Sequence, residues 1–321
     1  MRVLNAKDLR AALDMPTCIA AMERAFLDLA NEGYFNPLRM RFKQADDSPN
    51  WMTTMPSMRT AGTRRWALKE MVVCPGNRKT GGDALQGSVI LHDGDNGRVL
   101  AIADAPTLTE IRTAAVSGLA TRWLANKDAK TVAIIGVGIQ ARAHVSAMRT
   151  VLPDADILAW GRNADKMKEF AQAYGVGIAP SLESAVREAD VVCTATSTTD
   201  PIIRREWIKP GCHLNAVGSS RSTHVELFAE TVAAASLFVD RREAALKESG
   251  DILNAIKSGL VTSAHIQAEL GEVITGKHPG RRARDEFTLY KSLGLGTQDL
   301  AAIEAAMESA RSKGLGVEVE W

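Results

Sequence analysis

The chain has 321 residues, which is too long for one small hydrophobic core and predicts two domains. Its composition, 45% hydrophobic and 24% charged, is typical of a globular protein. Its 39 Lys and Arg residues nearly balance 38 Asp and Glu, which gives no electrostatic footprint for nucleic acid or an anionic membrane. The absence of a long apolar run, of a CxxC pair and of metal-ligand His spacing predicts a reduced cytoplasmic protein with neither a membrane span nor a metal site.

The first third of the chain predicts helices followed by a sheet. Residues 5–33 are typical of two helices, with Pro16 in the first turn of the second. Short β-like runs separated by turn signals then extend over 37–103, which predicts a mixed or antiparallel sheet. These runs are LRMRFKQ, NWMTTMPSM, RWALKEMVV, GSVILHD and RVLAIAD. A long helix is predicted over 107–126.

From residue 131 the pattern changes to alternating strands and helices. The predicted strands are TVAIIGVG, DILAWGR, DVVCTAT, HLNAVG and LFVD, and helical stretches lie between the earlier of them. Alternating units of this size predict a doubly wound parallel sheet and an α/β fold class. The last stretch, DLAAIEAAMESARSKG, predicts a helix that packs back on the first domain.

A glycine turn, GVGIQA, follows the first strand of this series. Gly136 permits a tight turn, Gly138 allows the backbone to approach a pyrophosphate, and Ala141 takes the third-glycine position. The helix that follows would direct its free N–H groups at the phosphates. The same motif occurs in turns that bind nothing, but its place between a strand and a helix favours dinucleotide binding.

The end of the second strand of the series bears on the choice of dinucleotide. NAD-preferring sites usually carry Asp or Glu there, to bond the ribose 2′-hydroxyl, and this chain has Gly161. Arg162, Asn163 and Lys166 follow, and Arg and Lys attract a 2′-phosphate. The alternative is a solvated basic turn. We therefore predict that NADP (NADPH) is preferred and that NAD is possible.

Six segments taken together resemble the ornithine cyclodeaminase/mu-crystallin family: MTTMPSM, ALKEMVVCPGN, TLTEIRTAAVSGLAT, GVGIQA, ELGEVITGKHPGR and YKSLGLGTQDLAA. The resemblance extends over about residues 37–305. It implies a homodimer in which a Rossmann domain (115–299) is inserted into an α+β substrate-binding and dimerisation domain (1–114 and 300–321). It also implies hydride transfer between a nicotinamide and a carbon of a small amino or imino acid.

The resemblance assigns roles to residues whose own patterns are ambiguous. Lys69 matches the catalytic lysine that binds the substrate carboxylate and assists proton transfer, although a lysine in a β-like run can also face water. Arg39 matches the arginine that clamps this carboxylate, and Arg41 would lie on the same strand face as a register alternative. Arg112, which alone could be a surface cation, is implied to contact substrate and cofactor. Met55 is implied to line the pocket.

The predicted site residues form two sets. The substrate set is Arg39, Met55, Lys69, Arg112 and Ser220. The cofactor set comes from the glycine turn, the strand ends and the long helix: Arg112, Thr113, Gly136, Val137, Gly138, Ile139, Gln140, Arg162, Asn163, Lys166, Thr196, Ser197, Val217, Ser219 and Ser292.

Two departures from the cyclodeaminase pattern separate the possible reactions. Ser220 takes the place of an Asp and Thr53 the place of a Glu, and ornithine ring closure needs such acid–base groups. The sequence therefore predicts an NADPH-dependent reductase of 2-imino acids or cyclic ketimines that forms L-amino acids. The alternatives are a cyclodeaminase of a basic amino acid, an NAD(P)-dependent amino-acid dehydrogenase and a ligand-binding protein without turnover.

Overall fold

The computed structural model of the chain describes residues 1–218 and 220–320, and for Arg78 the backbone only. The chain divides into two units, one made of Met1–Arg112 with Leu295–Trp321 and the other of Thr113–Gly294. The sequence places the second boundary after residue 299. Residues 295–299 instead belong to the first unit, because the helix α11 (Gly296–Lys313) packs its first turn on the strand β4 (Trp51–Arg59). The approach is so close that a Cβ on Gly296 would lie 2.7 Å from the Pro56 carbonyl oxygen.

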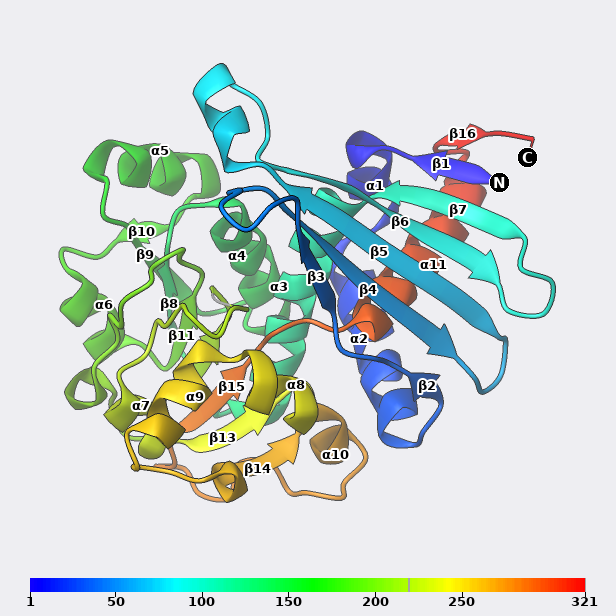
Figure 1. Cartoon of the computed structure of the whole chain (residues 1–321). Helices are drawn as coiled ribbons and strands as arrows, with labels where there is room; N and C mark the ends of the chain where they lie inside the picture. The colour runs from blue at the N-terminus through cyan, green and yellow to red at the C-terminus, as the bar shows by residue number, and fades with distance from the viewer. Residues whose placement is uncertain (219, 321) are drawn as a thin grey trace. The chain divides into compact units, whose positions relative to one another are not determined.

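The first unit is built on one mixed sheet, with strand order β16-β1-β7-β6-β5-β4-β2 and β3 paired with β4 (Figure 1). Neighbouring strands from β4 to β7 are antiparallel, and β1 is parallel to β7, so of the two predicted forms, mixed or antiparallel, the sheet is mixed. The strands are β1 (Arg2–Leu4), β2 (Tyr34–Phe35), β3 (Met40–Lys43), β4 (Trp51–Arg59), β5 (Arg65–Val73), β6 (Leu85–Asp93), β7 (Val99–Asp104) and β16 (Val317–Glu318).

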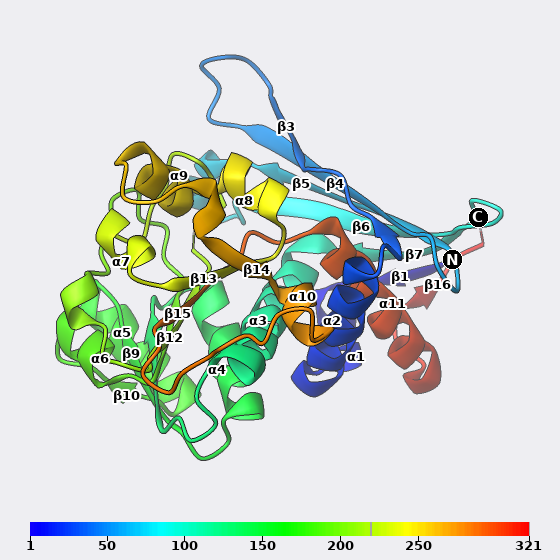
Figure 2. The ribbon, with the colours of Figure 1, turned by 90° about the horizontal axis from the view of Figure 1, so that it is seen from below.

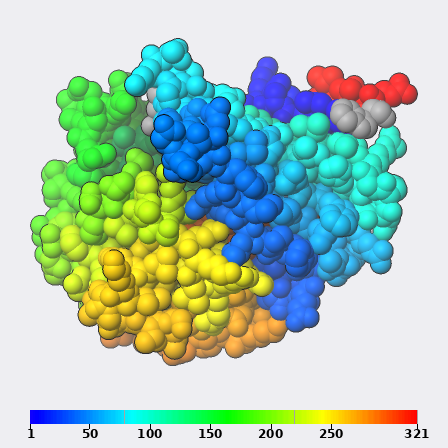
Figure 3. All heavy atoms as spheres, viewed as in Figure 1, coloured from blue at the N-terminus to red at the C-terminus, as the bar shows by residue number. Residues whose placement is uncertain are grey.

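Helices cover one face of this sheet. They are α1 (Ala6–Ala12), α2 (Met15–Ala30) and α11 (Gly296–Lys313), and a short 3-10 helix, η1 (Pro75–Thr80), joins β5 to β6 (Figures 1 and 2). The helix α3 (Ala105–Leu124) begins in this unit and continues into the other. The opposite face carries exposed apolar side chains, and the hairpin of β3 and β4, blue in Figure 3, lies at the surface.

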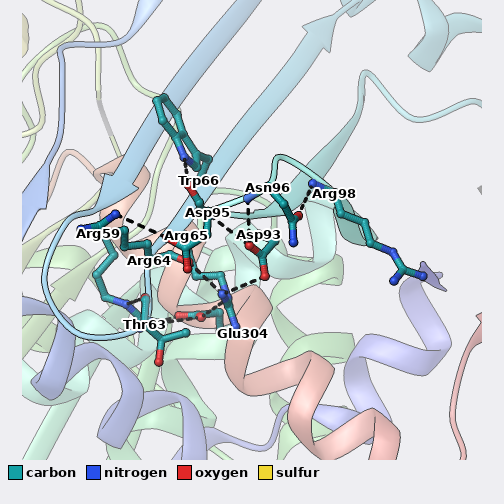
Figure 4. A network of polar contacts seen from close by, with 11 residues as sticks. Arg59, Thr63, Arg64, Arg65, Trp66, Asp93, Asp95, Asn96, Arg98 and Glu304 are labelled. Atoms are coloured by element: carbon teal, nitrogen blue, oxygen red, sulfur yellow. Dashed lines mark hydrogen bonds and ion pairs between the residues drawn. The ribbon is translucent and has the colours of Figure 1, made fainter.

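A polar network fixes α11 against the sheet. Glu304 of α11 accepts two hydrogen bonds from the Arg59 guanidinium, at 2.7 and 2.8 Å (Figure 4). It also forms an ion pair with Arg65, in which Arg65 Nε lies 3.2 Å from Glu304 Oε1. Arg65 also lies 3.6 Å from Asp93 at the end of β6. These contacts hold the helix whose first turn carries Gln298 and Asp299.

The second unit is a doubly wound parallel sheet with strand order β10-β9-β8-β11-β12-β15-β13-β14. Its strands are β8 (Thr131–Ile135), β9 (Asp156–Trp160), β10 (Gly177–Ile178), β11 (Val191–Thr194), β12 (His213–Ala216), β13 (Ser236–Val239), β14 (Ile266–Glu269) and β15 (Thr288–Lys291). The central strands β11, β12 and β15 are buried along their whole length. The α/β fold class with an inserted doubly wound domain is confirmed.

The helices that flank this sheet include α4 (Ile139–Val151), α5 (Ala164–Tyr174), α6 (Leu182–Glu188), α7 (Ala229–Ala233), α8 (Arg242–Glu248), α9 (Gly250–Lys257) and α10 (Leu270–Ile274), with 3-10 turns η2 (Arg205–Trp207) and η3 (Ser263–His265). No helix in the described part of the chain has both the length and the apolar composition of a membrane span. Within residues 1–218 and 220–320, no three His, Cys, Asp or Glu side chains are grouped so that they could hold a metal ion.

Candidate active site

The glycine turn after β8 has the backbone geometry that a phosphate site needs. Gly136 has φ +126°, and a Cβ there would lie 2.6 Å from the Ala195 carbonyl oxygen, so only glycine fits. Gly138 is the N-cap of α4, and a Cβ on it would meet nothing within 4 Å. Val137, Ile139 and Gln140 complete the turn and the first residues of the helix. The free N–H groups of this first turn and the open backbone at Gly138 fit a pyrophosphate.

The end of β9 combines a crowded glycine with exposed cations. A Cβ on Gly161 would lie 2.8 Å from a methyl group of Val137, so any larger residue at this position would require the Val137 side chain to move. Arg162 and Lys166 are exposed. Asn163 is the N-cap of α5, and its side-chain oxygen accepts a hydrogen bond from the Lys166 N–H at 2.9 Å. Asn163 therefore has a structural role, besides any contact with a ligand.

Most of the other predicted cofactor residues in this unit follow the carboxyl ends of strands, and one lies in the long helix α3. Thr196 and Ser197 follow β11, Val217 follows β12 and Ser292 follows β15, while the buried Thr113 lies in α3. Ser219 lies outside the described residues. Half-buried Ser220, from the substrate set, is in the loop after β12. Doubly wound sheets bind their ligands at this edge.

A buried cluster of charges in the first unit surrounds Lys69. Lys69 Nζ forms an ion pair with Asp299 Oδ2 at 2.7 Å, and Arg112 Nε donates to Asp299 Oδ1 at 2.9 Å. Arg112 also donates to Gln298 Oε1 at 2.9 Å, and each of these side chains is at least 95% buried. Met55 is the cross-strand partner of Lys69 and is also buried. The structure therefore brings Lys69, Met55 and Arg112 together.

The environment of Lys69 changes its protonation. Burial lowers the pKa of Lys69 from 10.5 to about 7, the negative charge of Asp299 opposes this shift, and the charges of Arg112 and Arg39 add to it. A lysine with this pKa exists in both protonation states near neutral pH. Such a group can donate a proton in one direction of a reaction and accept it in the other.

The structure distinguishes Arg39 from Arg41. Arg39 is half-buried just before β3, and its charge acts on Lys69. Arg41 is exposed within β3, and its guanidinium lies 6.0 Å from the centre of the Trp51 ring. Of the two arginines, Arg39 is thus the one that the structure associates with the Lys69 cluster.

Sequence reasoning missed Asp299 and Gln298. Both lie in the segment GTQDLAA, which contributed only to the family resemblance. The sequence carried no specific signal for them, because an acidic residue in the first turn of a helix is common. Thr53, next to Met55 on the inward face of β4, is 9% exposed, and among the described residues its hydroxyl has no hydrogen-bond partner. The position at which the resemblance implies a Glu in the cyclodeaminases is therefore occupied here by a buried neutral group.

Comparisons with known proteins identify the family of the chain. The model of the ornithine cyclodeaminase/mu-crystallin family matches residues 1–314. A Delta(1)-pyrroline-2-carboxylate reductase of Bacillus cereus is 34% identical over 100% of both chains, and the ketimine reductase mu-crystallin of Mus musculus is 40% identical over 73% of this chain and 72% of its own.

A solved structure gives the same result in three dimensions. The Delta(1)-pyrroline-2-carboxylate reductase of Thermococcus litoralis, in complex with NADH and L-proline, has a TM-score of 0.92 and 34% identity, with 99% of this chain and 100% of that chain covered. The resemblance in the motifs is therefore confirmed along the chain. The protein belongs to the ornithine cyclodeaminase/mu-crystallin family.

Proposed function

We propose that this protein is a nicotinamide-dependent reductase that converts a cyclic ketimine acid or another 2-imino acid into the corresponding L-amino acid. The observation that carries the proposal is the buried Lys69, paired with Asp299 beside Arg112, with a pKa near 7. The two curated relatives are named as reductases of such C=N compounds. The chain is accordingly an NAD(P)-dependent oxidoreductase.

The residues of the Lys69 cluster suit the two functional groups of an imino acid, its carboxylate and its C=N bond. Guanidinium groups bind carboxylates through paired, charge-assisted hydrogen bonds, a role that we assign to Arg112 and Arg39. A nicotinamide bound in its reduced form would supply the hydride for the imine carbon. Protonated Lys69 gives its proton to the imine nitrogen, so that the C=N bond becomes CH–NH and Lys69 ends neutral. Asp299 holds both cations in place and keeps Lys69 protonated up to neutral pH.

Two neutral residues argue against ring closure with loss of ammonia. That reaction needs acid–base help on a distal amine. Buried Thr53 and half-buried Ser220 carry hydroxyls at the positions where cyclodeaminases of the family are implied to have carboxylates. Reduction of a preformed C=N bond requires only a carboxylate clamp, a hydride and one proton.

A substrate panel tests the proposal. The protein is mixed with NADPH or NADH and with five- and six-membered cyclic ketimine acids, or with 2-oxo acids plus an amine, and loss of nicotinamide absorbance is followed. In parallel it is incubated with NAD and L-ornithine. We expect absorbance loss with a ketimine acid and neither ammonia nor proline from ornithine. Proline formation would replace the reductase by the cyclodeaminase.

We propose further that NADPH is the preferred cofactor, on the basis of Gly161 and exposed Arg162. Arg162→Ala should weaken NADPH binding by roughly 1–3 kcal/mol, or about 5–150-fold in Kd, because it removes a charge-assisted contact with the 2′-phosphate. Its Kd for NADH should hardly change. Lys168→Ala, an exposed cation on α5, is the control and should bind both as the wild type does. Equal wild-type affinity for NADH and NADPH, measured by calorimetry, would reject the preference.

We also propose that the active form is a homodimer, as the family resemblance implies. The face of the first sheet that no helix of its unit covers has exposed apolar side chains at Met40, Phe42, Met52 and Trp66. Light scattering at micromolar concentration should give about twice the chain mass of 34.6 kDa. Phe42→Asp should shift the mass toward the monomer, whereas Ile178→Asp, at an exposed site in the other unit, should not. A monomeric wild type rules the dimer out.

A further inference from the structure

A buried carboxylate in the second unit has no part in the proposed chemistry. Glu226 is 0% exposed and lies in the segment between β12 and α7. Its Oε1 accepts hydrogen bonds from the Thr196 N–H at 2.9 Å and the Thr196 hydroxyl at 2.7 Å. Its Oε2 accepts from the Thr194 hydroxyl at 2.7 Å and the Gly218 N–H at 2.8 Å. Each oxygen thus uses both of its lone pairs as an acceptor.

These four donors come from the ends of two adjacent strands. Thr194 is the last residue of β11, and its register partner Ala216 is the last residue of β12. Thr196 and Gly218 lie two residues beyond these strand ends. A Cβ on Gly218 would lie 2.2 Å from Glu226 Oε1, so the loop approaches the carboxylate as closely as glycine allows. Glu226 therefore ties the loop after β11 to the loop after β12.

The backbone of Glu226 is itself held firmly. The N–H groups of Glu226 and Leu227 donate to Asp251 Oδ1, at 2.7 and 3.0 Å. Asp251 Oδ2 lies 2.8 Å from Lys291 Nζ at the end of β15, and this ion pair is 99–100% buried. The Glu226 carbonyl oxygen also accepts hydrogen bonds from the N–H groups of Ile202 and Ile203. The carboxylate is thus a fixed point to which both loops are attached.

The strand order shows which half of a dinucleotide these loops would meet. In this fold two mononucleotide-binding halves adjoin at the point where the strand order reverses, here between β8 and β11. The half made of β8, β9 and β10 carries the glycine turn and the basic end of β9, which suit the pyrophosphate and the adenosine ribose. The half that begins with β11 and β12 is then left for the nicotinamide and its ribose.

We propose that Glu226 is a positioning residue for the nicotinamide half of the cofactor, because it fixes the backbone of the two loops that would receive it. This inference rests on the proposed function, since it requires that the second unit bind a nicotinamide dinucleotide. A glutamine at this position would turn one acceptor into a donor and set N–H groups against each other. The two loops would then separate. The glycine turn meets the first loop at Ala195, whose N–H donates to the Ile135 carbonyl oxygen of β8, so we expect its geometry to change less.

The test compares two probes on the full-length protein. NADPH spans both halves, whereas adenosine 2′-phosphate 5′-diphosphate lacks both the nicotinamide and its ribose and reports on the first half alone. In Glu226→Gln we expect the Kd of NADPH to rise at least tenfold and the Kd of the fragment to change less than twofold, by titration calorimetry. Thr194→Val removes one hydroxyl donor and keeps the side-chain shape. It should raise the Kd of NADPH about two- to fivefold and leave the Kd of the fragment nearly unchanged.

A control separates positioning from general loosening of the unit. Thr231→Val removes a buried hydroxyl that donates to the Ile203 carbonyl oxygen at 2.8 Å, and it should leave both Kd values unchanged. Should Glu226→Gln not fold, the split between the two probes in Thr194→Val decides. Parallel weakening of NADPH and the fragment in the Glu226 or Thr194 variant, or no weakening of either, overturns the inference. Failure of the wild type to bind any nicotinamide dinucleotide rejects the proposed cofactor itself.

Discussion

Replacing Lys69 by alanine is expected to lower kcat/KM for ketimine reduction by about 10²–10⁴-fold, the usual contribution of a positioned general acid. The variant loses the proton donor, and it leaves Arg112 as the cation paired with Asp299. Lys79→Ala, which removes an exposed lysine of the same unit, is the control and should keep the wild-type rate. An unchanged rate in Lys69→Ala would leave the reaction class standing but remove Lys69 from the mechanism.

The pH dependence of the wild type gives a second measurement of the same role. Reduction needs protonated Lys69, whose pKa is about 7, so kcat/KM should be level below that pH and fall tenfold per unit above it. Oxidation of the amino acid needs neutral Lys69, so its rate should rise through the same pH. The descending limb of reduction should be absent from the residual activity of Lys69→Ala. A wild-type limb that lies only above pH 9 would mean that another group donates the proton.

The fold was predictable wherever the pattern was local and long. Alternation of apolar residues identified β4 to β7, and the strand–helix rhythm identified β8, β9, β11, β12 and β13, because each of these patterns lies within one segment. The terminal strands β1 and β16 were not predicted, since each has only two or three residues and they pair with each other across the whole chain. Strand β15 was missed for a similar reason, because its place between β12 and β13 depends on pairing with distant segments.

The candidate site divides in the same way. The glycine turn was identifiable because a glycine pair between a strand and a helix is a local signal. Lys69 was identified through the family resemblance, since a lysine in a β-like run can also face water. Asp299 was not, since an acid in the first turn of a helix is ordinary and its partner Arg112 is 187 residues away. The same holds for Glu226, whose partners come from two different loops. Buried networks assembled from separate segments are visible only once the chain is folded.

Asp299→Asn is expected to damage both stability and proton transfer. The substitution removes the negative charge that lies between Lys69 and Arg112, all three being at least 95% buried. Leaving a buried charge unpaired costs about 3–5 kcal/mol in the free energy of unfolding. Lys69 can relieve part of this cost by losing its proton, so we expect the lower end of the range in urea unfolding at pH 7. The control is Asp95→Asn, whose exposed pair with Arg64 should contribute at most about 1 kcal/mol.

The sign of the accompanying change in pH dependence follows from the charges around Lys69. Asp299 raises the pKa of Lys69 against the effect of burial, while Arg112 and Arg39 lower it. Without the Asp299 carboxylate, burial and the charges of the two arginines remain, and each of them lowers the pKa of Lys69. This pKa must therefore fall below 7. The descending limb of ketimine reduction in Asp299→Asn should therefore move to more acid pH, so that the variant loses more activity at pH 7 than at pH 5.5. A limb that stays at the wild-type pH would show that Lys69 is not the group titrating, because the loss of this neighbouring charge must shift the pKa of Lys69.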